Sequence, residues 1–395
     1  MKDYNFLSSF ELKKGVHLKN KIVMAPMTTM SSFYNGMVTK DELDYYAARA
    51  GGPGMVITAV ANVSDNGKGF EGELSAASDD MILSLNSLAR TIQGEGSKAI
   101  LQIFHAGRKT FSRIIGGEQP VSASAVKAQH PTNSEMPREL SSEEIETIIT
   151  DFGQATKRAI LAGFDGVELH GANTYLLQQF YSENSNQRTD KWGGSRDERM
   201  TFAKAVIKEV KSVINEHAND SFVLGYRLSP EEIENPGIKL EDSLYFVDYL
   251  TKEIDYIHIS MGSYKRTSLN DNSDSKPILT RFIETVDGRK PIIGVGSVES
   301  PSDAEEVLNI GPSLVGIGRE LLREPNWVQK VQSGDEVSIR KNISASDMDQ
   351  LAIPSVMQTY LKESFHSVMH FTTDTQEIED YSNQMAPMEG IEKKL

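Results

Sequence analysis

Short apolar segments recur along the chain and are separated by polar or glycine-containing segments. Most are rich in β-branched residues and apolar at consecutive positions, which is typical of parallel strands buried on both faces. The segments predicted as strands are Lys21–Met27, Gly54–Val60, Lys98–His105, Gly166–His170, Phe222–Ser229, Tyr256–Met261, Pro291–Ser297 and Leu314–Arg319.

Helical patterns lie between these segments. Three of them begin with a serine or threonine followed three residues later by a glutamate, at Thr39, Ser141 and Ser195, a spacing typical of capping boxes. Strands that alternate with helices in this way predict an α/β protein, a (β/α)8 TIM barrel. A doubly wound open sheet is the alternative, but the Gly-x-Gly-x-x-Gly turn that usually follows its first strand is missing.

The two ends of the chain carry additions to the barrel. Residues 10–18 alternate around a Lys-Gly turn and predict a hairpin that caps the barrel bottom. We predict a barrel domain over residues 1–330 and a C-terminal extension over 331–395. Within the extension, Asp347–Leu361 is predicted as helix restarting at Pro354, and Thr372–Leu395 as a flexible tail.

Composition narrows the class of protein. The 395 residues carry 41 basic and 56 acidic side chains, a net charge of −15, which argues against a nucleic-acid or anionic-membrane partner. No segment approaches the roughly 18 apolar residues of a membrane helix, and the N-terminus has no apolar signal core. Cysteine is absent, so disulfides and thiolate metal sites are excluded and a cytoplasmic location is expected. No metal site is predicted, and a homo-oligomer is compatible with the sequence.

The fourth predicted strand ends in the most informative side chains. His170, Asn173 and Tyr175 follow one another on the turn into the next helix, at the end of the barrel where active sites lie. Two hydrogen-bonding groups and one weak acid could hold a carbonyl oxygen and protonate a neighbouring carbon. The alternative is an ordinary turn, with a histidine that caps the helix and a tyrosine packed in the core.

Other strand ends indicate what the site binds. Gly296-Ser297 and Gly318-Arg319 end the seventh and eighth strands, where barrels commonly bind phosphate, so a phosphorylated ligand is predicted. Arg227 and Gln102 are polar positions inside apolar strands. Arg227 either pairs with a carboxylate such as Glu168 or faces an electron-rich ligand edge. Gln102 offers a donor and an acceptor together.

Together these segments resemble the bacterial short-chain branch of the old yellow enzyme family of FMN-dependent oxidoreductases. The resemblance extends from about Phe6 to Trp327. Its motifs are Asn20-Lys-Ile-Val-Met-Ala-Pro-Met-Thr28, Leu101-Gln-Ile-Phe-His-Ala-Gly-Arg108, His170-Gly-Ala-Asn-Thr-Tyr-Leu-Leu-Gln-Gln-Phe180, Asn186-Gln-Arg-Thr-Asp-Lys-Trp-Gly-Gly-Ser195 and Val315-Gly-Ile-Gly-Arg-Glu320.

The resemblance implies a cofactor and a reaction. NADH or NADPH reduces FMN, and the flavin N5 then passes hydride to an activated alkene, an α,β-unsaturated carbonyl compound or similar electrophile. His170 and Asn173 bind the carbonyl oxygen and Tyr175 donates the proton. The resemblance assigns FMN binding to Ala25, Pro26, Met27, Thr28, Ala59, Gln102, Arg227, Gly296, Ser297, Gly318 and Arg319.

Within this assignment Thr28 lies near the flavin O4, Gln102 at the pyrimidine edge and Arg227 near N1 and O2. One departure is Met30, which stands where several relatives carry a substrate-contacting tyrosine, so substrate preference cannot be transferred.

Two alternative functions stay open. One is a barrel lyase or aldolase acting on a phosphorylated metabolite, although no Schiff-base lysine or metal-binding carboxylates stand out at strand ends. The other is a non-catalytic flavin-binding protein.

Overall fold

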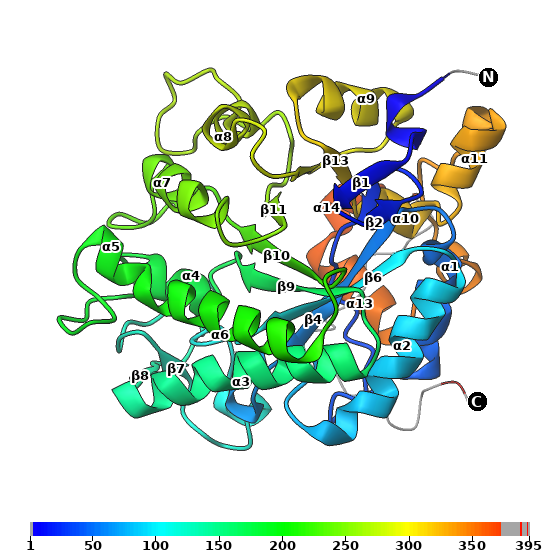
Figure 1. Ribbon diagram of the computed structural model, residues 1–395. Helices are drawn as coiled ribbons and strands as arrows, with labels where there is room; N and C mark the ends of the chain where they lie inside the picture. Colours follow the sequence, from blue (N-terminus) through cyan, green and yellow to red (C-terminus); the bar gives the residue numbers. More distant parts are fainter. Residues whose placement is uncertain (1–2, 373–387, 389–392, 394–395) are drawn as a thin grey trace.

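The barrel is closed by parallel pairing of consecutive strands, as the computed structural model shows for residues 3–372, 388 and 393 (Figure 1). The strand order β3-β13-β12-β11-β10-β9-β6-β4 returns to its start because β4 also pairs with β3. The barrel strands are β3 Ile22–Met24, β4 Met55–Asn62, β6 Lys98–Phe104, β9 Gly166–Gly171, β10 Val223–Leu228, β11 Tyr256–Ile259, β12 Ile292–Val295 and β13 Leu314–Ile317. Each coincides with a predicted segment, so the TIM-barrel prediction is confirmed.

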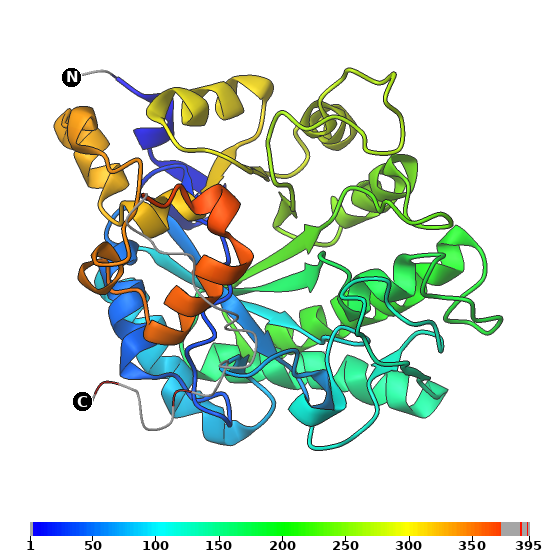
Figure 2. The same ribbon diagram turned by 180° about the vertical axis from the view of Figure 1, so that it is seen from behind.

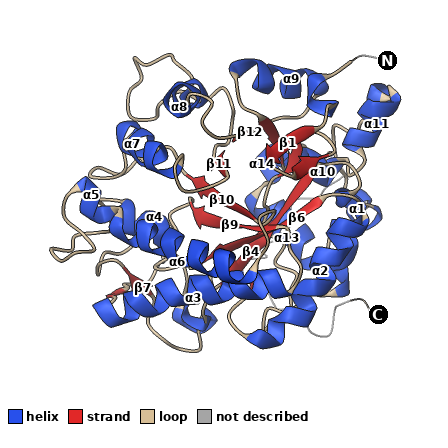
Figure 3. Cartoon of the chain, in the orientation of Figure 1, coloured by secondary structure: helices blue, strands red, loops and turns tan. Residues whose placement is uncertain are grey.

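Helices surround the strands (Figure 3), because each buries an apolar face against the sheet. Ser141 and Ser195 form complete capping boxes, whereas Thr39 only caps its helix. Helices α1 to α11 are α1 Lys40–Ala50, α2 Ile82–Gly94, α3 Ser142–Leu161, α4 Leu176–Tyr181, α5 Arg196–Arg199, α6 Thr201–His217, α7 Leu240–Leu250, α8 Ile278–Val286, α9 Pro301–Ile310, α10 Arg319–Arg323 and α11 Trp327–Ser333.

The barrel interior is filled from the bottom upward, because alternate residues of each strand point inward. The predicted hairpin forms from β1 Phe10–Lys13 and β2 Val16–Leu18. Its buried Leu12, Val16 and Leu18 pack against the lowest inward-facing layer of the barrel. The side-chain layers above these apolar residues carry the polar residues of the barrel interior. The hairpin therefore closes one end of the barrel and leaves the other end for chemistry.

Short elements occupy the connections. The long connection after β6 holds two-residue strands, β7 Val121–Ser122 and β8 Arg138–Glu139, which pair with each other. A further short strand, β5 Leu74–Ser75, extends the sheet beside β4.

Within the described residues, three α-helices follow α11. They are α12 Asp347–Gln350, α13 Ser355–Ser364 and α14 His366–Met369. Helix α13 starts directly after Pro354, as predicted. Residue 330, the predicted boundary, lies within α11, and the division into a barrel and an extension stays a prediction. Figure 2 shows α13 and α14 in orange and red, on the face where the barrel strands end. Most of the predicted flexible tail lies outside the described residues.

Candidate functional site

A cavity of about 350 Å³ opens at the carboxyl ends of the barrel strands. Most of the predicted site residues line it: Ala25, Pro26, Met27, Thr28, Asn173, Tyr175, Arg227, Gly296, Ser297, Gly318 and Arg319. The other three, Ala59, Gln102 and His170, are almost fully buried beside it. The residues were named from separate strand ends, and closure of the barrel brings them together.

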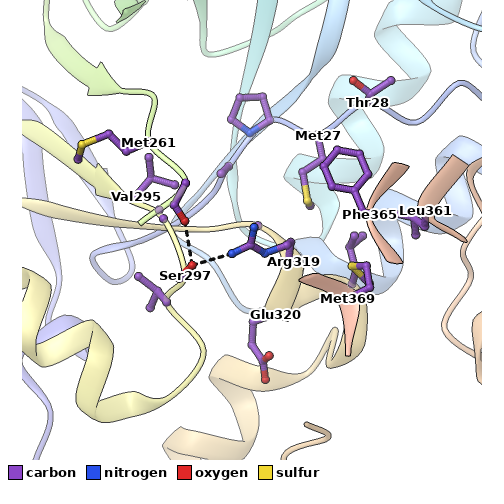
Figure 4. A pocket seen from close by; sticks show the side chains of 18 of the residues that line it. Met27, Thr28, Met261, Val295, Ser297, Arg319, Glu320, Leu361, Phe365 and Met369 are labelled. Carbon is purple, nitrogen blue, oxygen red and sulfur yellow. Dashed lines mark hydrogen bonds between the residues drawn. The ribbon is translucent and has the colours of Figure 1, made fainter. Parts of the chain in front are cut away.

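One end of the cavity is polar and is formed by the loops after β12 and β13. The Arg319 guanidinium donates to the Ser297 hydroxyl at 2.7 Å, and that hydroxyl donates to the Gly262 carbonyl at 2.8 Å (Figure 4). Gly296 has a φ of +120°, and a Cβ there would lie 2.7 Å from a backbone carbonyl oxygen. Only glycine fits this close approach. A cation, a hydroxyl and closely placed backbone are the groups that hold a phosphate.

His170 and Asn173 each have one polar atom fixed by the protein. The backbone N–H of Ala172 donates to His170 Nδ1 at 3.3 Å. Burial, and then the charge of Arg227, lowers the pKa of His170 well below its usual value, so the ring is neutral and its proton sits on Nε2. The Ser260 hydroxyl donates to the carboxamide oxygen of Asn173 at 3.1 Å, which leaves the Asn173 amide as a donor. Two N–H donors are therefore free for a ligand oxygen.

Tyr175 sits among aromatic neighbours at the same strand end. Its ring contacts Phe104 and His170 edge-on, with centroids 4.7 and 5.1 Å apart. Burial, followed by nearby Glu73, raises the pKa of Tyr175 above its usual value. The phenol therefore keeps its proton at neutral pH, so it can act as an acid but not as a base.

A buried carboxylate lies one layer below these groups. Glu168 accepts hydrogen bonds from Gln102 Nε2 at 2.6 Å, from the Tyr256 hydroxyl at 2.9 Å and from His258 Nδ1 at 3.0 Å. Burial opposes its ionisation, but His258, Arg227 and Gln102 hold the pKa of Glu168 below its usual value. The carboxylate is thus shared by three donors, while the Nε of Arg227 is buried without a hydrogen-bond partner.

Part of the cavity wall comes from residues that were not predicted. Met357, Tyr360, Leu361, Phe365 and Met369, all from α13, α14 and the residue between them, line the cavity. Four of them recur every four residues, a spacing that marks one face of a helix. That spacing could have identified the apolar face but not the surface it covers. No residue of the connection 106–140 lines the cavity.

Comparison with known proteins identifies the family. Residues 7–337 match the NADH:flavin oxidoreductase / NADH oxidase family, the family of the old yellow enzymes. The chain belongs to this family. Old yellow enzymes bind FMN and take electrons from NADH or NADPH, so the predicted family and cofactor are confirmed.

Two curated relatives differ in how much of their length this old yellow enzyme chain covers. An NADH:fumarate oxidoreductase of Klebsiella pneumoniae is 44% identical over 88% of the chain, and the match spans 38% of that protein. The probable NADH-dependent flavin oxidoreductase YqiG of Bacillus subtilis is 43% identical over 87% of the chain and 92% of its own length. The chain therefore spans nearly all of one relative and well under half of the other.

Comparison with solved structures gives the same barrel fold. Morphinone reductase in complex with tetrahydroNAD superposes with a TM-score of 0.71 at 24% sequence identity, over 84% of this chain and 91% of that one. At this identity the likeness concerns the fold alone. Within the described residues, no helix is both long and apolar enough to cross a membrane.

Proposed function

We propose that this chain is an FMN-dependent ene-reductase that uses NADH or NADPH as reductant. The observation that carries the proposal is the convergence of two free N–H donors, from His170 and Asn173, and one protonated phenol, from Tyr175, beside a cavity with a phosphate-competent end. A lyase or aldolase is not favoured, because no lysine lines this cavity in the described part of the chain.

The residues present fit an FMN. Ser297, Arg319 and the backbone of Gly296 would hold its phosphate, and Ala25 to Thr28 together with Gly318 would line its ring. The buried Nε of Arg227, which has no hydrogen-bond partner, would face the N1 and O2 edge. A cation at that edge stabilises a reduced flavin that carries negative charge.

Gln102 is oriented for the same cofactor by Glu168. One N–H of its side-chain amide donates to the Glu168 carboxylate, and the amide oxygen would be left to bind the pyrimidine edge of a bound flavin. Ala59 lies at the neighbouring strand, where its backbone N–H donates to the Tyr46 hydroxyl at 2.7 Å, and only its methyl group is left to touch the ring.

The protein's own groups perform the rest of the reaction. When bound, FMN supplies a hydride to the β-carbon of the acceptor. The His170 Nε2 proton and the Asn173 amide donate to the acceptor's carbonyl oxygen and stabilise the negative charge that develops there. Tyr175 gives its proton to the α-carbon and regains one from solvent. Because the pKa of Tyr175 is raised, this role depends on its position rather than on its acidity.

The identity of the alkene that this chain reduces is not determined. One relative is named for fumarate and another, from Vibrio harveyi, for acrylate, but the chain spans 38% and 34% of those two proteins. Conjugated carboxylates are therefore candidates alongside uncharged enones. The cytoplasmic location and a homo-oligomer also stay predictions.

A spectrum and a turnover assay test the proposal. Purified protein supplied with FMN should be yellow, and it should oxidise NADH or NADPH when 2-cyclohexenone is added as acceptor. A protein that binds no FMN would contradict both the cofactor and the reaction. A yellow protein that passes no hydride to any alkene would favour the non-catalytic flavin-binding alternative.

A further inference from the structure

Glu73 is a buried acid with no part in the reaction described so far. It directly precedes β5, the short strand that pairs with β4, and its side chain is 1% exposed. The backbone N–H of Gly69 donates to Glu73 Oε2 at 2.9 Å, whereas Glu73 Oε1 is buried without a hydrogen-bond partner. Because Oε2 already accepts from the backbone, Oε1 is the oxygen left to carry a proton.

The charges around Glu73 favour its protonated form. Lys68, the nearby cation, donates instead to the Glu71 carboxylate at 3.0 Å and to the Tyr34 carbonyl at 2.8 Å. Burial raises the pKa of Glu73 well above its usual value, against the smaller opposing effects of the Gly69 N–H and of Lys68. Glu73 therefore keeps its proton to a higher pH than an exposed glutamate does.

Glu73 and Tyr175 line two different cavities. Tyr175 lines the cavity at the strand ends that was described above. Glu73 lines a second cavity of about 810 Å³, which extends to the exposed side chains of Asp80 and Glu118. Solvent can therefore reach the surroundings of Glu73 without passing through the cavity that holds the acceptor.

Phe104 connects the two acids. A Cβ added at Gly69 would lie 3.1 Å from Glu73 Oε2 and 3.3 Å from Cζ of Phe104. The Phe104 ring in turn meets Tyr175 edge-on, with centroids 4.7 Å apart. After burial, the charge of Glu73 is the largest contribution to the raised pKa of Tyr175. The carboxyl group thus lies near enough to the phenol for each to respond to the charge of the other.

We propose that Glu73 returns a proton to Tyr175 after each alkene reduction, and that the second cavity is the entry for protons from solvent. The inference rests on the proposed function, because it completes the proton path of the same site. Glu73 does not line the acceptor cavity and acts through Tyr175, so it is a positioning residue for the proton.

The proton steps balance without any further reagent. The O–H bond of Tyr175 breaks as the C–H bond at the α-carbon forms, which leaves a phenolate. The phenolate then takes the Oε1 proton of Glu73, directly or through one water. This transfer is favourable because a carboxylic acid is a stronger acid than a phenol. Water in the second cavity finally protonates the Glu73 carboxylate, and no electrons move in these last two steps.

The test compares the first turnover with steady-state turnover in Glu73→Gln. FMN-loaded protein is reduced beforehand without oxygen and mixed with 2-cyclohexenone, and reoxidation of the flavin is followed by stopped flow. This first turnover uses the proton that Tyr175 already carries, so its rate should be unchanged in Glu73→Gln. Steady-state kcat with excess nicotinamide and enone should fall about tenfold or more, because a positioned acid contributes a hundredfold or more and water retains some access.

The pH profile distinguishes proton transfer from a structural role. Steady-state kcat of the wild-type protein should fall as pH rises through the pKa of Glu73, because only the protonated acid can deliver a proton. Lys68, Glu71 and Tyr175 are the titratable groups that act on Glu73 or respond to it. Glu73→Gln leaves these groups in place and should lack the fall. Glu73→Asp keeps an acid at the position and should retain the fall together with part of the lost kcat.

Glu118→Gln is the matched control, since its carboxyl group is exposed at the outer end of the second cavity, and it should change neither rate. An unchanged steady-state kcat in Glu73→Gln, or equal losses in the first and later turnovers, would overturn the proposal even if the wild-type protein reduces the enone. If Glu73→Gln does not fold, a Glu73→Asp variant whose kcat has lost the fall at high pH would overturn it as well. A wild-type protein that reduces no alkene would refute the proposed function and the proton path with it.

Discussion

The charge of Glu168 should set the reduction potential of the bound flavin. Its carboxylate lies in the barrel interior, one side-chain layer below His170, and is fully buried. Reduction of a flavin to its anionic form adds one negative charge close above this layer. The substitution E168Q removes the buried charge and nearly preserves the volume, and we expect it to make the flavin easier to reduce.

The size of this effect follows from strand geometry. Inward-facing residues two positions apart on one strand are separated by about 6.6 Å. If the negative charge of the reduced flavin lies one such spacing above the Glu168 carboxylate, the two unit charges interact with about 2.5 kcal/mol at an effective dielectric constant of about 20. For a two-electron couple, 30 mV corresponds to about 1.4 kcal/mol, so the potential should rise by about 50 mV.

The assay is a spectroelectrochemical or dye-equilibration measurement of the flavin midpoint potential at pH 7. Tyr256→Phe is the matched control, because it removes one of the three hydrogen bonds to Glu168 and keeps the charge. This control should move the potential by much less than E168Q does. A potential that is unchanged or lowered in E168Q would refute the electrostatic reasoning, and an equal shift in both variants would indicate that hydrogen bonding rather than charge is responsible.

Three further outcomes are expected. Tyr175→Phe should slow alkene reduction by about 10²-fold or more while leaving flavin reduction by the nicotinamide largely intact in stopped-flow measurements, and equal losses in both half-reactions would contradict a proton-donor role. Burial raises the pKa of Glu42 to about 7, while Thr29 and Ser32 hydrogen-bond its carboxyl. The folded protein should therefore lose about 3 kcal/mol of stability as pH rises from about 4.5 to 7 and above, and urea unfolding of Glu42→Gln should lack this loss. Gly296→Ala should weaken FMN binding or lower stability by about 1–3 kcal/mol, because its left-handed backbone and close backbone neighbours leave no room for a methyl group; an unchanged melting temperature together with unchanged FMN affinity would refute this.

The strand ends could be predicted well because their signal is local. A run of β-branched apolar residues forms a strand wherever it can be buried on both faces. Its last inward position then projects from the carboxyl end of the barrel. This is why Ser297, Arg319 and Asn173, drawn from three distant segments, line one cavity.

Pairing between distant residues could not be predicted in the same way. The sequence offered Glu168 as an ion-pair partner for Arg227, but the structure directs hydrogen bonds to that carboxylate from Gln102 and His258. Similarly, the Thr39–Glu42 spacing indicated a capping box, yet the Glu42 side chain bonds with Thr29 and Ser32 instead. In both cases several partners of suitable chemistry exist, and only their spatial order selects among them.

By itself, the sequence determined the eightfold alternation of strands and helices, the hairpin at the bottom and the residues at the upper strand ends, because each depends on periodicity or on turn chemistry within a short segment. Only the tertiary structure decided that α13 and α14 return to the barrel mouth and place Tyr360 in the wall of the cavity. A helix carries an apolar stripe whatever it packs against. The surface that this stripe covers is fixed by the path of the chain between the last barrel strand and the helix, and no local pattern encodes that path.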